Sequence, residues 1–168
     1  SGKIGQAFSH DGADGRMDVA DDTTLDVGTT FTKHIWFNTD VISGTQGMFL
    51  QGYDNSSGKN NYMNVSGSGN LAYGIHTHGT ASGSTVVSAG TWYHGEVTYD
   101  AATLTIYLDG AFETSDTPTI VMNTDSRIII GRWERVTVPG GCCPFDGLLD
   151  DAALWNLALT ADEVKCLY

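Results

Sequence analysis

The stretch Phe31-Thr32-Lys33-His34-Ile35-Trp36-Phe37-Asn38 decides the fold class, because two sets of side chains alternate along it. The odd-numbered positions carry Phe, Lys, Ile and Phe, whereas the even-numbered positions carry Thr, His, Trp and Asn. Successive side chains of a β-strand point to opposite faces, so a period of two is the pattern of a strand. The stretch therefore predicts a β-strand.

Short runs of the same kind recur along the chain and are separated by turn residues. Asp109-Gly110 is a dipeptide typical of a tight hairpin turn. About a dozen strands at a spacing of roughly 8–12 residues favour an all-β fold, a two-sheet antiparallel β-sandwich of the jelly-roll type. The remaining runs lie at 6–9, 16–19, 47–52, 61–65, 70–76, 91–99, 103–108, 126–131 and 148–155.

One short helix is predicted near the C-terminus. Thr160-Ala161-Asp162-Glu163 has the form of a capping box, with Thr160 at the N-cap and Glu163 three residues later. We expect this helix to end near Leu167. No internal repeat or linker is visible, so residues 1–168 are expected to form a single domain, which we take to be part of a larger protein.

Composition limits the classes of partner. The 168 residues carry 20 acidic and 8 basic side chains, for a net charge of −12. Binding to nucleic acid or to an anionic membrane surface needs a basic patch, so neither partner is expected. No run of 18 apolar residues is present, and we expect no membrane insertion. Four of the acidic residues are Glu and the rest are Asp. Aspartate is the residue type that favours turns and hard-cation sites.

Three cysteines leave two possibilities open. Cys142 and Cys143 are adjacent, and a bond between neighbours would be strained. In an oxidising compartment one of the pair, Cys143, is expected to bond Cys166 and to leave one thiol over. Three reduced, buried thiols are the alternative. The spacing does not suit zinc.

Several motifs, taken in order, resemble the laminin-G-like jelly rolls of the concanavalin A-like lectin and glucanase superfamily. The resemblance covers nearly the whole chain, and it implies the fold but not the ligand. It is carried by residues 2–15, by 31–36, by Thr91-Trp92-Tyr93-His94 and the hairpin that follows to Gly110, by Ile129-Ile130-Gly131, and by 145–151 and 155–164.

The resemblance also implies a structural Ca²⁺ ion between the early turn and the last strand. The implied ligands are Asp11, Gly12 through its carbonyl, Asp14 and Asp150. Calcium takes six to eight hard oxygen ligands, so carboxylates and a carbonyl suit the role. Asp150 and Asp151 are expected to point to opposite faces of one strand, so only one of them can serve. The alternative is that Asp11 and Asp14 only shape a turn.

Two polar segments with aromatic residues are candidates for a glycan surface. Trp133 is flanked by charges and is expected to stack on a sugar, although packing against its own loop is an equal alternative. Tyr53 and Tyr62 could instead pack on a sheet. The histidines of His76-Thr77-His78 share one face of a strand, where they could bind a transition metal, line a polysaccharide groove or face solvent. The candidate ligand residues are Tyr53, Asn55, Asn60, Tyr62, His76, His78, Arg132, Trp133 and Arg135.

Catalysis is not expected. Hydrolysis of a glycosidic bond needs two carboxylates on either side of it, and the four glutamates are scattered along the sequence. We therefore expect a calcium-stabilised, non-catalytic module of a secreted, cell-surface or virion-surface protein that binds a glycan or a cell-surface glycoprotein. The alternatives are a spacer domain of a larger adhesin, enzyme or virion fibre and, behind it, a glycoside hydrolase or polysaccharide lyase.

Overall fold

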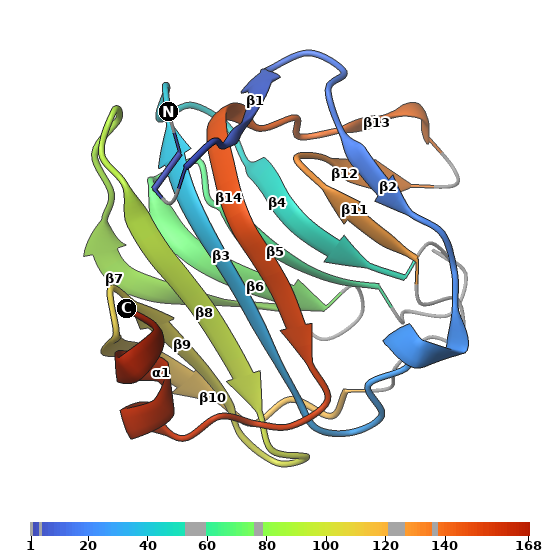
Figure 1. The fold of residues 1–168 in the computed structure, drawn as a ribbon, viewed down its shortest axis with the longest axis vertical. Coiled ribbons are helices and arrows are strands. Elements are labelled where there is room, and N and C mark those ends of the chain that lie inside the picture. Colours follow the sequence, from blue (N-terminus) through green and yellow to red (C-terminus); the bar gives the residue numbers. More distant parts are fainter. Residues whose placement is uncertain (1, 4, 53–59, 76–78, 121–126, 136–137) are drawn as a thin grey trace.

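The computed structural model is an all-β sandwich of two six-stranded sheets, in which every strand pair is antiparallel, as predicted. The structure describes residues 2–3, 5–52, 60–75, 79–120, 127–135 and 138–168, with the backbone alone at 134–135 and 138–140. Figure 1 shows the two sheets stacked face to face. Within the described residues, no helix is both long and apolar enough to cross a lipid bilayer.

Sheet A has the strand order β1-β14-β3-β8-β9-β10, and sheet B has the order β2-β11-β4-β5-β6-β7. The strands of sheet A are β1 (Phe8–Asp11), β14 (Asp146–Trp155), β3 (Phe31–Thr39), β8 (Tyr93–Tyr99), β9 (Leu104–Leu108) and β10 (Ala111–Asp116). Those of sheet B are β2 (Met17–Val19), β11 (Ile128–Ile130), β4 (Gln46–Gln51), β5 (Asn61–Val65), β6 (Asn70–Ile75) and β7 (Gly79–Val86).

The core lies between the sheets, and β3 shows how the alternating pattern builds it. Phe31, Ile35 and Phe37 belong to the main hydrophobic cluster and are fully buried. Lys33 shares their face, because it is two residues from Phe31 and two from Ile35, and it is also fully buried. The even-numbered residues of β3 therefore lie on the outer face of sheet A.

The predicted helix forms and covers part of the outer face of sheet A. Helix α1 (Ala161–Leu167) begins at Thr160, which accepts a hydrogen bond from the Glu163 backbone, and the Glu163 side chain accepts one in return. Helix α1 and the N-terminal segment lie on the same side of the sandwich (Figure 1). The Lys3 ammonium lies 4.3 Å from the centre of the Trp36 ring, and the Tyr168 ring stacks on Trp36 at 5.8 Å.

A small hairpin adds a third layer beside sheet B. Its strands are β12 (Trp133–Arg135) and β13 (Val138–Cys142). The hairpin lies directly over β4 at Gly47, where a Cβ atom would come within 2.7 Å of the Trp133 backbone nitrogen. Glycine is therefore required at position 47, because any side chain would push the hairpin away from sheet B.

Candidate functional site

A stacked pair of aromatic rings marks the outer face of sheet B. Tyr62 on β5 and Trp133 on β12 have ring centres 3.8 Å apart, with 31° between the ring planes. Beneath them Leu50 and Ile129 complete a small hydrophobic cluster that is separate from the main core. The Tyr62 ring lies over Gly74 of β6, where even a Cβ atom would overlap it. The absence of a side chain at Gly74 therefore leaves room for the Tyr62 ring on the outer face of sheet B.

The structure brings together part of the predicted glycan surface and corrects one assignment in it. Trp133 and Tyr62, which were predicted from different segments, are in contact. Trp133, however, is only 9% exposed, so the prediction of an open stacking platform is wrong and the packing alternative holds. The physical reason is that the hairpin turns Trp133 inward, onto Leu50 and Ile129. Tyr62 is half-buried and is the more exposed ring of the pair.

Buried polar groups lie near the aromatic pair. Asn64 on β5 pairs with Gly47, over which the hairpin lies, and its Oδ1 atom has no hydrogen-bond partner among the described residues. Arg132 precedes β12 and is buried, and within the same set its Nε atom has no partner. Asn60 is buried as well. Tyr53, Asn55, His76 and His78, and the side chain of Arg135, lie outside the described residues.

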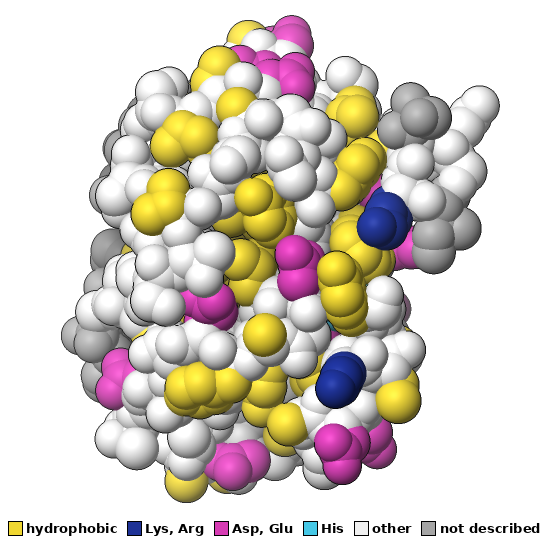
Figure 2. All heavy atoms as spheres, turned by 90° about the vertical axis from the view of Figure 1, so that its left-hand side faces the viewer, with side chains coloured by type: hydrophobic (Ala, Val, Ile, Leu, Met, Phe, Trp, Pro, Cys, Tyr) yellow, Lys and Arg dark blue, Asp and Glu magenta, His cyan; other side chains and the backbone are white. Residues whose placement is uncertain are grey.

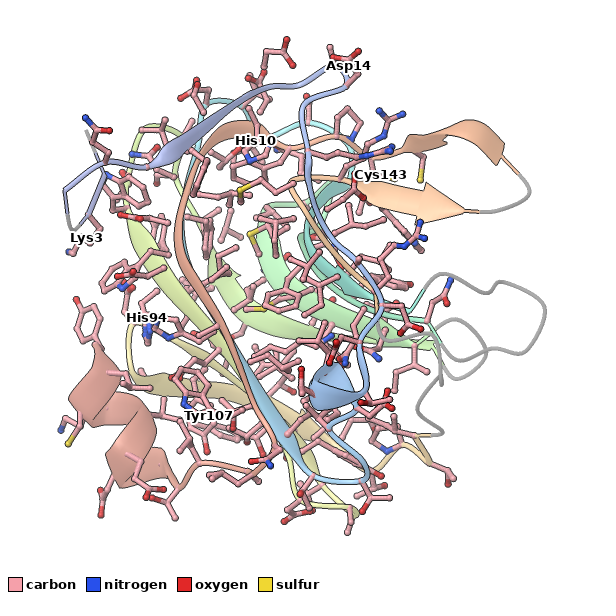
Figure 3. All side chains as sticks on the ribbon, turned by 45° about the vertical axis from the view of Figure 1, so that its right-hand side comes forward. Lys3, His10, Asp14, His94, Tyr107 and Cys143 are labelled. Carbon is pink, nitrogen blue, oxygen red and sulfur yellow. The ribbon has the colours of Figure 1, made fainter. Side chains whose placement is uncertain are left out.

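The early turn meets the last strand, but not at the residue that was predicted. Asp11 on β1 pairs with Asp146, the first residue of β14. A Cβ atom on Gly12 would lie 3.1 Å from the Asp146 carboxylate, so this carboxylate leans over the turn. The Asp11 carboxylate accepts a hydrogen bond of 3.0 Å from the Ala13 backbone. Figure 3 shows Asp14 at the tip of the turn between β1 and β2, near the outside of the molecule.

Asp150 does not join this turn, so the structure does not bring the predicted ligands Asp11, Gly12, Asp14 and Asp150 together; Asp150 is the member that the strand register separates from the others. Asp150 pairs with Trp36, four residues further along β14 than Asp146, and at about 3.3 Å per residue that is about 13 Å away. It lies beside Gly2 instead.

The expectation that Asp150 and Asp151 point apart also fails. A β-bulge between Asp150 and Ala153 interrupts the alternation, and Asp151 has a φ of 47°. Both aspartates line one groove of about 350 Å³ between the edges of the two sheets. The other lining residues of this groove are Phe8, Met17, Val19, Ile130, Leu149 and Ala152, so its walls are mainly apolar.

None of the three cysteines forms a disulfide, so the predicted bond between Cys143 and Cys166 is not formed. The Cys143 and Cys142 sulfur atoms lie 2.7 Å apart, next to the aromatic pair on sheet B. Cys166 is exposed on α1, which lies on the outer side of sheet A, and Figure 3 shows Cys143 far from that helix. The sandwich itself therefore separates the two thiols.

The sequence of the chain matches one family model over most of its length. The model, Laminin_G_3, is described as the concanavalin A-like lectin/glucanases superfamily and matches residues 11–165. The chain belongs to this superfamily. No curated protein shows significant sequence similarity to the chain.

Solved structures of domains from two carbohydrate-active enzymes have the same fold as this superfamily member. One is the carbohydrate-binding module CBM40 of the Ruminococcus gnavus IT-sialidase, bound to α2,3-sialyllactose, with a TM-score of 0.78, 11% identity and coverage of 97% of this chain and 96% of that one. Another is domain 4 of the arabinanase AbnA from Geobacillus stearothermophilus, in complex with arabinotriose, with a TM-score of 0.76, 20% identity and coverage of 99% and 78%. At these identities the likeness concerns the fold alone.

The structure of this lectin-like domain also assembles a polar cluster that was not predicted from the sequence. His34 on β3 and Glu96 on β8 are paired residues on the outer face of sheet A, and His94 is their neighbour. His94 Nε2 lies 2.7 Å from His34 Nδ1, which lies 3.5 Å from a Glu96 oxygen. Within the described part of the chain, this is the group of His, Cys, Asp and Glu side chains whose geometry could hold a metal ion. The sequence contains a signal for this cluster. His94 and Glu96 are two residues apart in a predicted strand, so they share one face of it, as His34 and Trp36 do in theirs.

Burial sets the charge of this cluster. All three side chains are buried on the outer face of sheet A, where His34 packs against Trp155 and His94 against the Trp36 and Tyr168 rings. The pKa of His94 is lowered from 6.5 to about 3, mainly by burial and in smaller part by the positive charges of His34 and Lys3. Burial raises the pKa of Glu96, and the bond to His34 opposes part of that rise. Figure 3 shows His94, Tyr107 and Lys3 on the same side of the molecule. His94 is therefore neutral at every pH above about 3.

Proposed function

We propose that this domain is a non-catalytic carbohydrate-binding module, and that it binds a neutral glycan on the outer face of sheet B beside Tyr62. The observation that supports this most directly is the pair formed by the partly buried Tyr62 ring and the more deeply buried Trp133 ring that stacks on it. Sugars pack their C–H groups against aromatic rings. Because Tyr62 is stacked with Trp133 and lies over Gly74, the sugar would meet the part of the Tyr62 ring that remains exposed. The fold is shared with modules that were crystallised with sialyllactose and with arabinotriose, which supports the same class of ligand.

The charge of the chain argues for a neutral glycan. With a net charge of −12, the domain repels anionic sugars such as sialylated chains at low salt. On the face drawn in Figure 2, the side of β7, β8 and α1, the basic side chains also lie apart from one another. The proposal therefore places arabinose-type oligosaccharides ahead of sialylated ones.

A role in hydrolysis is not proposed, because the glutamates whose side chains are described have other partners. Glu96 is buried with His34 and His94, Glu163 caps α1, and Glu113 on β10 accepts hydrogen bonds from the Ser84 and Thr85 backbones on β7. We also propose that the parent protein is secreted or displayed on a surface, since a module that binds glycans must meet them there.

The test is a binding titration with arabinotriose and with α2,3-sialyllactose, on the intact chain and two variants. Tyr62→Ala should weaken binding of arabinotriose about tenfold, or ~1.4 kcal/mol. Tyr168→Ala removes an exposed ring from the opposite side and should leave the affinity unchanged. Equal affinities of all three proteins for arabinotriose would contradict the site, and binding of neither sugar by any of them would favour the spacer alternative.

Calcium remains a proposal, and its place moves to the corner formed by Asp11, Gly12 and Asp146. Two carboxylates and a carbonyl from a turn are the donors that calcium prefers, and the Asp146 carboxylate already leans over Gly12. A hundredfold excess of calcium over its Kd would stabilise the fold by about 2.7 kcal/mol. In a domain of this size the melting temperature would rise by about 5–11 °C.

The calcium proposal is tested by melting the protein in calcium and in EDTA. The rise should vanish in Asp146→Ala and persist in Asp150→Ala, because the two aspartates lie about 13 Å apart along β14. If Asp150→Ala abolished the rise and Asp146→Ala did not, the assignment to this corner would be overturned.

A further inference from the structure

Lys33 is a charged residue type at the centre of an apolar core. Its side chain is fully buried between the two sheets. The rings of Phe49, Tyr73 and Phe31 surround its amine, with ring centres 5.0, 5.4 and 5.7 Å from Nζ. Within the described part of the chain, no carboxylate forms an ion pair with it. Burial of an unpaired ammonium in an apolar core costs a large amount of free energy. A lysine at this position therefore needs an explanation other than an ordinary charged side chain.

The Lys33 amine lies against the side-chain amide of a residue on the opposite sheet. Lys33 on β3 belongs to sheet A, and its Nζ atom contacts Oδ1 of Asn61, on β5 of sheet B. Asn61 is 1% exposed. The Tyr73 hydroxyl donates a hydrogen bond of 2.8 Å to the same oxygen. An amine, an amide carbonyl and a hydroxyl that polarises this carbonyl are thus held together away from water.

We propose that Lys33 and Asn61 react with each other to form an intramolecular isopeptide bond that joins the two sheets. The Lys33 nitrogen attacks Cγ of Asn61, the new Nζ–Cγ bond forms, and the Cγ–Nδ2 bond breaks. A proton from Nζ moves to the departing nitrogen, which leaves as ammonia. The atoms balance without any oxidant or further reactant.

Each residue near the bond has a role in this reaction. Burial lowers the pKa of the Lys33 ammonium well below its usual range, so the amine is neutral and has a free lone pair. Tyr73 stabilises the negative charge that develops on Oδ1 during the attack, and burial keeps its hydroxyl protonated by raising its pKa well above the usual range. Tyr73 is a positioning residue for the amide, whereas the apolar rings exclude the water that would compete with the amine.

The bond would link residues that are 28 positions apart in the sequence. A cross-link of this kind restricts the unfolded chain in the same way as a disulfide. The three cysteines form no disulfide, so among the described residues the isopeptide bond would be the covalent link between the sheets. It is insensitive to reducing agents, and it requires neither calcium nor a glycan.

The mass of the intact, denatured and reduced chain decides the proposal. A cross-linked chain is lighter than its sequence by one ammonia molecule, whereas deamidation would make it heavier. Digestion should release one branched peptide that joins the segments around Lys33 and Asn61. Lys33→Met and Asn61→Ala should each have the full mass expected from their sequences. Lys165→Met, which removes an exposed amine, should still show the loss of ammonia.

Melting and the rate of the reaction give second readouts. Lys33→Met should melt below the cross-linked chain, whereas removal of an uncross-linked buried amine would raise the melting temperature. Tyr73→Phe should accumulate the lighter mass more slowly after refolding than the intact chain does. A purified chain that has the full mass of its sequence would overturn the proposal, whatever the melting temperatures are.

Discussion

Replacement of Trp133 by Ala should destabilise the fold, because the ring is part of a packed cluster. It is 9% exposed, stacks on Tyr62, and rests on Leu50 and Ile129. Removal of a buried aromatic ring costs roughly 3–5 kcal/mol, and a small cluster near the surface belongs at the lower end of that range. A loss of about 3 kcal/mol corresponds to a fall in melting temperature of about 6–12 °C in a domain of 150–250 residues.

The assay is thermal melting followed by tryptophan fluorescence and by circular dichroism, with Phe112→Ala as the control. Phe112 is an aromatic residue that is 63% exposed on β10, so its removal should change the melting temperature by less than about 2 °C. If Trp133→Ala melted within 2 °C of the intact chain, the β12–β13 hairpin would not depend on this ring. The argument that Trp133 holds the Tyr62 ring in place would then fail.

Two further perturbations test the cluster on sheet A and the helix cap. His94 has a pKa of about 3 in the folded protein against 6.5 in the unfolded chain. Its contribution to stability is therefore full above pH 6.5 and is lost as the pH falls toward 3, by at most about 1.4 kcal/mol per pH unit. His94→Asn should flatten this part of the pH–stability curve, and an unchanged slope would contradict the burial argument. Burial raises the pKa of Glu96, so its contribution is lost as the pH rises through that raised value, and Glu96→Gln should flatten the curve above pH 4.5. Thr160→Ala removes the N-cap of α1 and should cost about 1 kcal/mol, whereas Thr80→Ala on the exposed edge strand β7 should cost little.

The parts of the fold that the sequence predicts well are those where a local rule acts alone. The period of two placed β3 correctly. Asp109 and Gly110 have φ angles of 52° and 71°, as the predicted tight turn requires. The capping box at Thr160 formed with both of its hydrogen bonds. The strand β7 (Gly79–Val86) was missed, because its exposed Thr, Ser and Gly residues resemble a turn; pairing with β6 makes it a strand.

The candidate site was harder to predict because it depends on pairing between distant segments. Asp146 and Asp150 are equally acidic in the sequence, and the register of β1 against β14 decides which of them meets the early turn. Trp133 is flanked by charges, and the fold of the hairpin over Gly47 turns it inward. Neither fact is contained in composition, spacing or local propensity, since each depends on residues about 85 to 135 positions apart in the chain.

Lys33 shows what an exception to the alternating pattern can mean. In Phe31–Phe37 it is the one residue on the core side that is not apolar, and its partner Asn61 is likewise a polar residue at a core-facing position of β5. Natural sequences break local rules mainly where something compensates for the cost. Two such exceptions on opposite sheets meet at one carbonyl oxygen, which Tyr73 also contacts. Buried polar groups need hydrogen-bond partners in any case, so the pairing alone would also suit an unreacted amine and amide. The loss of one ammonia molecule from the mass of the chain separates the reaction from such a hydrogen bond.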